Sequence, residues 1–438
     1  MMSMRRVVIT GMGVITPLGN SCEELWDGLL AGRSGVAPIS TVPVEYLPTK
    51  FAAEARDFTG HIDNFGPLEG DKKKAIRKGL KVMCRESQMG VAAAQRALTH
   101  AGLGASDALD PERSGVVFGS DYMITAPDDF AAGIQQCIDE SGDFDFSRWA
   151  TEGMPHLTPL WLLKYLPNMP ASHVAIFNDM RGPNNSITLR EASANAAVGE
   201  ATRTILRGSA EVMLAGATGT RIHPMKIVHT LTQEEVARNG VEPARASRPF
   251  DLNRGGMVLG EGAGVIVLEE LQHALDRGAT VFGEVLGTAS SSVANQSGVA
   301  QRETALVNCM KGALRSADRA SSSVGHLHAH GLSTRSCDEA EARAIHAVFG
   351  DDAARLPVTA AKSYFGNLGA GGGLVELIAS VMAMRHNRLF GVLNYETPDP
   401  KCELAISRGD DEAGSSFLNV SVTPQGQASA VIVGSVDA

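Results

Sequence analysis

The sequence lacks several features that would point to particular classes of protein. Its six cysteines are scattered without a CxxC spacing, which argues against a disulfide framework or a zinc site and favours a reducing, cytoplasmic location. No apolar run reaches the roughly 18 residues that a membrane helix needs, so we expect no membrane insertion. The start of the chain is too short and too interrupted by glycine for a signal peptide. Positive charge is also in deficit, and the net charge of -10 argues against a nucleic-acid partner.

Glycine, by contrast, is abundant. The chain has 47 glycines and 44% hydrophobic residues, but only 5% aromatic residues. This composition is typical of a compact α/β protein with many tight turns. The 438 residues suffice for two or three ordinary domains or for one large duplicated domain.

The order of predicted elements indicates a duplication. Apolar runs with glycine predict buried strands at 6–17, 114–120, 211–217, 265–270 and 280–290. Helical spacing predicts helices at 22–30, 72–101 and 192–206. The order of strand, glycine turn and buried helix returns over 353–420. We therefore predict an N-terminal half over 1–268, with an inserted loop region at about 122–165, and a C-terminal half over 269–438.

Five segments along the chain carry a family resemblance. They are 6–19, 168–173 with 181–183, 249–254 with 260–264, 329–334, and 362–373. In this order they resemble the elongating β-ketoacyl-acyl carrier protein synthases of the thiolase superfamily. The resemblance implies a thiolase-like duplicated five-layer αβαβα fold in a homodimer, or in a heterodimer with another ketosynthase. It also implies a narrow acyl tunnel and no bound cofactor, since the phosphopantetheine arm arrives on acyl carrier protein.

The chain departs from this family at the residues that carry the chemistry. The resemblance places a cysteine thiolate where Glu191-Ala192-Ser193 stands, and a second histidine where Asn367 stands. His330 matches the first histidine. A helix macrodipole does not ionise a serine hydroxyl, so Ser193 would need His330 as a general base. Alternatively, Ser193 only caps its helix. Asn367 either donates to the reacting oxygen or is a satisfied turn residue.

The resemblance also assigns supporting roles to other residues. Lys362, Asp338, Glu341 and Glu376 would order the polar network of the site, and as buried charges they must be paired. Pro424 and Gln425 stand where the family has a gating phenylalanine, and proline has no swinging ring. A further group, Lys74, Arg77 and Lys78, resembles the docking helix for the acidic carrier protein. A solvated basic helix would have the same pattern.

Three functions fit these residues. The first is a synthase-like acyltransferase with an atypical Ser-His-Asn site, acting on carrier-bound chains in fatty acid or polyketide-type biosynthesis. The second is a silent partner subunit of an active ketosynthase, like a chain-length factor. The third is a malonyl-carrier decarboxylase, which needs donors to the enolate but no thiol.

Overall fold

Two sets of five strands with the same internal order form the main sheet of this computed structural model, which describes residues 5–68, 70–104 and 109–436. The first set is β1 (Val7–Ile15), β4 (Ser114–Ser120), β5 (Asn184–Thr188), β6 (Val212–Thr220) and β7 (Glu261–Glu270). The second set is β8 (Gly283–Ser292), β9 (His326–His328), β10 (Val358–Thr359), β11 (Ser416–Val422) and β12 (Gln427–Gly434). Strands β2 (Ala37–Pro38) and β3 (Phe51–Ala52) pair separately.

The strand order shows that the second set repeats the first. The orders are β5-β4-β6-β7-β1 and β10-β9-β11-β12-β8, so corresponding strands occupy corresponding places. Directions match as well: the first three strands of each order run parallel to one another, and the last two pair antiparallel. The sets meet where β1 pairs with β8, at Val8 with Glu284 and Ile9 with Gly283. The predicted duplicated α/β fold is confirmed, whereas the division at 268/269, two residues before β7 ends, stays a prediction.

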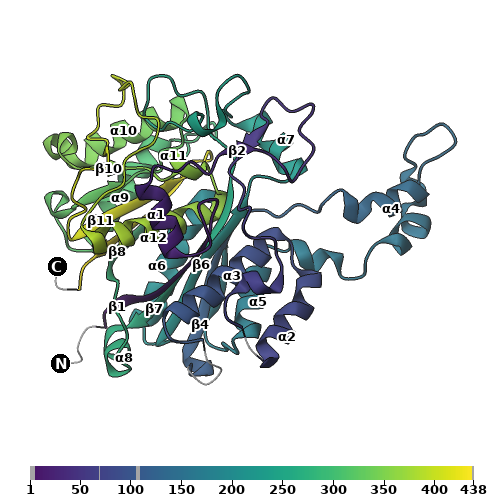
Figure 1. The fold of residues 1–438 in the computed structure, drawn as a ribbon, viewed down its shortest axis with the longest axis horizontal. Helices are drawn as coiled ribbons and strands as arrows, with labels where there is room; N and C mark the ends of the chain where they lie inside the picture. The colour runs from purple at the N-terminus through teal and green to yellow at the C-terminus, as the bar shows by residue number, and fades with distance from the viewer. Residues whose placement is uncertain (1–4, 69, 105–108, 437–438) are drawn as a thin grey trace.

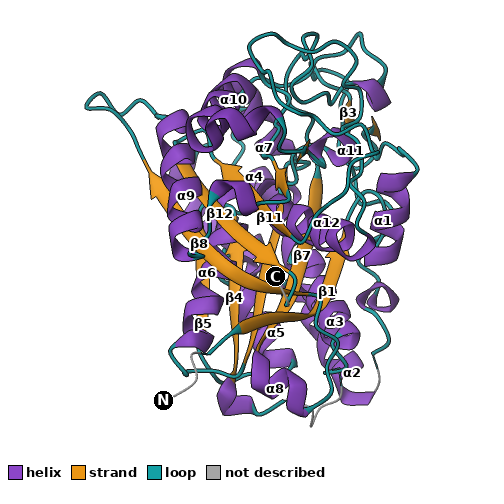
Figure 2. Ribbon diagram, turned by 90° about the vertical axis from the view of Figure 1, so that its left-hand side faces the viewer, coloured by secondary structure: helices purple, strands orange, loops and turns teal. Residues whose placement is uncertain are grey.

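Helices form three layers around the strands (Figures 1 and 2). The inner layer is α6 (Ser193–Leu206) and α12 (Gly372–His386), and each contacts strands of both sets. The outer layers include α3 (Arg85–His100) with α5 (Met169–Phe177), and α9 (Arg302–Ser316) with α10 (Arg335–Phe349). The other helices are α1 (Cys22–Leu30), α2 (Gly70–Gly79), α4 (Asp128–Gln136), α7 (Pro224–Gln233), α8 (Leu271–Asp276) and α11 (Lys362–Phe365).

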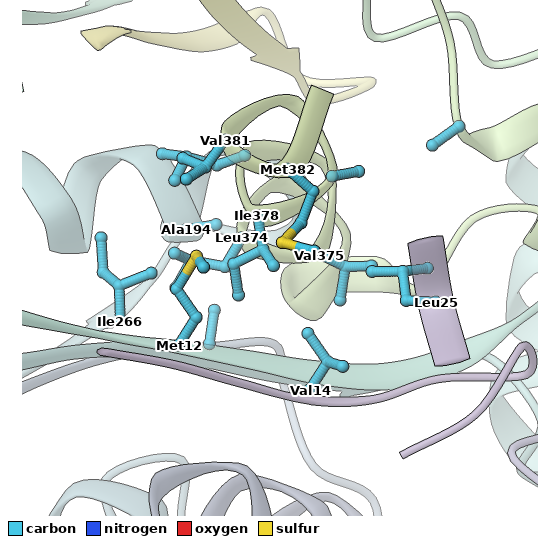
Figure 3. Packing of buried hydrophobic residues seen from close by; sticks show 14 of the residues in the cluster. Met12, Val14, Leu25, Ala194, Ile266, Leu374, Val375, Ile378, Val381 and Met382 are labelled. Carbon is cyan, nitrogen blue, oxygen red and sulfur yellow. The ribbon is translucent and has the colours of Figure 1, made fainter. Parts of the chain in front are cut away.

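Helix α12 is buried over 372–383, and every residue of that stretch except Glu376 and Ser380 is apolar or glycine. Figure 3 shows Leu374, Val375 and Ile378 of α12 packed over Met12 of β1 and Ile266 of β7. A helix of this kind needs cover on all sides, and the duplicated fold supplies it by placing α12 between the two strand sets of the main sheet. Within the described residues, no helix combines the length and the apolar character needed to cross a bilayer.

Two predictions about local structure are wrong. The single helix predicted at 72–101 is split into α2 and α3, because the chain is extended at Met83. The predicted loop region at about 122–165 contains α4 and several short helical turns, and it extends from the body as an arm (Figure 1). Contacts among Phe130, Trp149 and Trp161 hold the arm together. Other apolar side chains of the arm are exposed, among them Phe146 at 75% and Leu160 at 67%.

A chain of hydrogen bonds, in which every donor and acceptor can be assigned, runs through the two histidines of β9. The Ala361 N–H donates to Nε2 of His328, so the ring proton of His328 lies on Nδ1 and is donated to Ser380 Oγ. The Ser380 hydroxyl then donates to Nε2 of His326, whose Nδ1–H donates to the carbonyl oxygen of Ala413. Both rings must be neutral for this order, and burial lowers the pKa of His326 to about 4.

We predict that acid weakens the fold through His326, and that a His326→Asn variant loses this part of the pH dependence. An unfolded histidine takes up its proton near pH 6.5, but folded His326 does so only at about 4. Its stabilisation is therefore complete above pH 6.5 and is lost as the pH falls to about 4. The difference is about 3 kcal/mol across that range.

Urea unfolding of both proteins at several pH values across this range measures the effect. Replacing the exposed His346 of α10 by asparagine is the matched control. Equal pH slopes for the wild type and His326→Asn would contradict the prediction.

Candidate active site

Ser193 lies where strand β5 turns into helix α6. A short 3-10 turn, Arg190–Ala192, joins the two elements, and Ser193 is the first residue of α6. Its buried hydroxyl donates to the carbonyl oxygen of Ser120 at 2.9 Å and accepts from the Leu189 N–H at 2.7 Å. The capping alternative is wrong, because Ser193 already has helical backbone angles and Ala192 stands at the cap. The hydroxyl instead ties the end of β4 to the turn before α6.

His330 lies just beyond β9, with both ring nitrogens buried. Lys362 Nζ lies 3.3 Å from Nδ1, whereas Nε2 has no hydrogen-bond partner among the described residues. An ammonium group only donates, so Nδ1 accepts and the proton of the neutral ring is on Nε2. Burial, followed by the charge of Lys362, holds the pKa of His330 well below its ordinary value. His330 is therefore a neutral donor through Nε2, and it does not accept the proton of Ser193.

The supporting residues hold His330 and its loop in place. Lys362 forms a buried ion pair with Glu376 of α12. The Glu341 carboxylate accepts the N–H groups of His330 and Gly331 at 2.6 and 2.8 Å. Burial raises the pKa of Glu341 to about 7.

Asp338 holds the next residues of the same loop. Its carboxylate accepts the N–H groups of Leu332 and Ser333 at 3.0 and 3.1 Å, and Arg254 lies 3.5 Å away. Of the four predicted supporting residues, Asp338 and Glu341 hold the loop that contains His330. Glu376 pairs with Lys362, which lies against the His330 ring. Only part of this network consists of ion pairs.

Asn367 makes the contact of a turn asparagine, whereas its role as a donor to the reacting oxygen stays a prediction. Its Oδ1 accepts the Gly369 N–H at 3.0 Å, as a turn asparagine does. Its amide Nδ2 donates to the Glu191 carboxylate at 3.0 Å. Because Glu191 occupies this donor, the donor faces a side chain of the protein itself.

A buried ionic network beside Ser193 was missed from the sequence. Arg221, at the end of β6, is wholly buried and forms ion pairs with Glu191 and with Asp121, the latter at 3.2 Å. Burial would raise the pKa of Glu191, but Arg221 and Arg190 outweigh it and hold that pKa well below the usual range. Arg190 also forms an ion pair with Glu234. An arginine directly after a buried strand is the one sequence signal that pointed to such a network.

A cavity of about 80 Å³ opens next to this network, and we call it the mouth. Its lining includes Pro424, Glu234, Leu332 and Thr334, and the role of Pro424 as a gate residue stays a prediction. Arg302, another lining residue, is close enough to help lower the pKa of His330. The mouth therefore lies within electrostatic range of His330, and two of its lining residues, Leu332 and Thr334, follow His330 in the same loop.

Gln425, the second residue of the predicted gate region, lies beside the mouth. It is exposed, and its side-chain oxygen accepts from Arg190 at 3.5 Å.

Within the described residues, no group of three or more His, Cys, Asp or Glu side chains is arranged to hold a metal ion.

The predicted docking residues are on helix α2. Lys74, Arg77 and Lys78 are all exposed, and Lys74 pairs with Asp71 at 3.0 Å. Lys81, in the 3-10 turn that follows α2, is exposed as well. These residues form an exposed basic surface, which we call the α2 basic surface.

Comparisons with known proteins agree with this architecture. The sequence model described as "Beta-ketoacyl synthase, N-terminal domain" matches residues 4–274, and the corresponding C-terminal domain matches residues 282–396. The 3-oxoacyl-[acyl-carrier-protein] synthase 2 of Coxiella burnetii is 36% identical over 404 residues, covering 92% of this chain and 91% of its own.

Two solved structures extend the comparison. One is a type II PKS acyl-carrier protein in complex with its ketosynthase bound to the hexaketide, and the other is the ishigamide ketosynthase/chain length factor. Each is similar with a TM-score of 0.82 and 27% identity, covering 99% of this chain and 100% of the other. Two family models over most of the length, together with relatives above 30% identity, establish that the chain belongs to the β-ketoacyl synthase family of acyl-transferring enzymes.

Proposed function

We propose that the protein acts on thioesters carried by acyl carrier protein in fatty acid or polyketide synthesis, and that it decarboxylates a malonyl-type group. The observation that carries this proposal is the buried Nε2 of His330, which is a donor without a partner. Decarboxylation needs such a donor where negative charge develops on the thioester oxygen. It needs no covalent bond to the protein.

The hydrogen bonds of Ser193 weigh against a covalent acyl intermediate. Its proton is donated to a backbone carbonyl, which is not a base, and His330 presents a protonated nitrogen. A helix N-terminus stabilises negative charge by only about 1 kcal/mol, far too little to ionise a serine. Acylation of Ser193 would require both contacts to rearrange.

The reaction balances with the groups at hand. The bond between the carboxylate carbon and the α-carbon breaks, CO₂ leaves, and its electron pair forms an enolate whose oxygen accepts the His330 Nε2–H. The α-carbon then takes a proton from water, which gives an acetyl-type thioester. Asn367 would be a second donor only after releasing Glu191.

The charged interior also favours a short acyl group. Arg221, Glu191 and Asp121 are buried beside Ser193. A long hydrocarbon chain placed there would have to separate these charges without replacing their partners, which is costly in a buried site. A malonyl-type group is short and would displace fewer of these charged groups.

A second function, as a partner subunit of another ketosynthase, is favoured by the arm. Exposed apolar side chains such as Phe146 and Leu160 are concentrated on it, and contiguous exposed apolar groups commonly mark protein interfaces. The similar ishigamide structure pairs a ketosynthase with a chain length factor. Such a subunit would shape the site of its partner and release no CO₂.

The first test of the proposal uses malonyl-loaded acyl carrier protein, released CO₂ and intact mass. We predict CO₂ release without an acyl adduct on the protein. Release should persist in Ser193→Ala and fall about 10²- to 10³-fold in His330→Ala, which is the usual effect of removing one donor to a developing oxyanion.

The matched control is His346→Ala, which changes an exposed histidine whose ring contacts the carbonyl oxygen of Glu403 instead of the residues of the site. An adduct that disappears in Ser193→Ala would replace the proposal with covalent acyl transfer. Absence of CO₂ together with co-purification of another ketosynthase would replace it with the partner-subunit function.

The second test concerns docking of the carrier protein. We predict that Arg77→Glu with Lys78→Glu weakens carrier-protein binding about tenfold or more and removes most of its salt dependence, because opposite charges steer such encounters. Titration calorimetry or surface plasmon resonance at two salt concentrations measures both effects.

The control reverses two exposed basic residues of α9, Lys311 and Arg315, which carry the same total charge in the other half. If the α2 and α9 variants weaken binding equally, the effect is one of net charge and the docking assignment is wrong.

A further inference from the structure

Arg190 connects the mouth of the site to its floor. Its guanidinium forms an ion pair with Glu234, which lines the mouth, and donates to Gln425 at 3.5 Å. On the other side, its Nε lies 3.6 Å from the carboxylate of Glu191. The side chains of Arg190 and Glu234 are only 11% and 6% exposed. The pair is therefore almost wholly buried, with Glu234 at the mouth and Arg190 in the turn that leads directly to Ser193.

The backbone at Arg190 supports a special role for this residue. Its φ is 51°, in the left-handed region that residues other than glycine seldom adopt. Such a conformation persists only where the surrounding contacts impose it, and it is concentrated at functional sites. Here the conformation directs residues 190 and 191 towards different partners, Glu234 at the mouth and Arg221 at the floor.

Among the described residues that line the mouth, none is aromatic. Pro424 lines the mouth with a rigid ring, and its φ is fixed by that ring. Closure of the mouth must therefore come from another element than Pro424. The Arg190–Glu234 pair is the contact that spans the mouth.

We propose that Arg190 and Glu234 form an ion-pair gate that controls access to Ser193 and His330. Opening separates the two side chains and turns Arg190 outwards, past Gln425, into solvent. Glu191 stays in place during opening because Arg221 holds it independently. The gate admits a narrow group such as a thioester arm with its short acyl group. It deepens the proposed function, but closure is a property of the entrance and does not depend on which reaction follows.

A test by accessibility keeps the two proposals separate. In a Ser193→Cys background, iodoacetamide reports whether a small neutral molecule reaches the floor of the site. All six natural cysteines are buried, and peptide mapping distinguishes them from position 193. Rates are compared on the plateau above the thiol pKa.

We predict that adding Arg190→Ala or Glu234→Ala speeds alkylation at position 193 about tenfold or more, since opening no longer has to break a charge-assisted contact. Adding Arg190→Lys should give an intermediate rate, because lysine keeps the charge but loses the planar fork. The two alanine variants change the local charge in opposite directions. Faster reaction in both therefore reports opening and not a change in thiol reactivity.

Arg245→Ala is the matched control, since Arg245 forms a comparable pair with Glu396 but is half exposed elsewhere on the surface. Equal rates in the background and in both gate variants, or equal acceleration by Arg245→Ala, would overturn the gate. Circular dichroism checks folding, and Glu234→Ala tests the same contact if Arg190→Ala does not fold. If the wild type releases no CO₂ but the gate variants still speed alkylation at position 193, the proposed function is refuted and the gate stands.

Discussion

The burial of Arg221 is the constraint on which the rest of the site depends. A wholly buried guanidinium must be paired, and Glu191 and Asp121 supply the two carboxylates. Glu191 also accepts from Asn367, which belongs to the second half of the fold. One carboxylate thereby joins the turn before α6 to the loop after α11. Because Glu191 is two residues from Ser193, the same contact fixes the turn on which Ser193 lies.

Much of the fold could be predicted from the sequence because its strands are buried on both faces and read as continuous apolar runs. The symmetry between the halves was visible only as an order of elements, since it resides in strand order and direction and not in shared residues. The arm was taken for a loop because its helices pack on a few aromatic side chains such as Phe130 and Trp149. Small clusters of this kind leave no helical periodicity in the sequence.

The site was predictable to the extent that its residues belong to motifs. Ser193, His330 and Asn367 were expected on the strength of such motifs, and so was Lys362. What each one contacts was not predictable. The partners of Arg221 come from the end of β4 and the turn after β5, and these approach it only because β4 lies between β5 and β6 in the sheet. The partner of Arg190 comes from the end of α7, on a third segment.

The geometry around Ser193 is that of an oxygen site. Its two hydrogen bonds, at 2.7 and 2.9 Å, have lengths that a hydroxyl satisfies and a sulfur does not, because contacts to sulfur are several tenths of an ångström longer. A thiol in the same place would lengthen at least one of them or turn away. The serine is therefore integrated into the backbone of two elements, and it is not merely a cysteine with one atom exchanged. In the same way, the charged pairs beside it and the proline at the mouth change the environment that a thiolate and an apolar acyl chain would require. These differences are consistent with one another, and together they shift the chemical emphasis of the site from a nucleophile to the Nε2–H donor of His330.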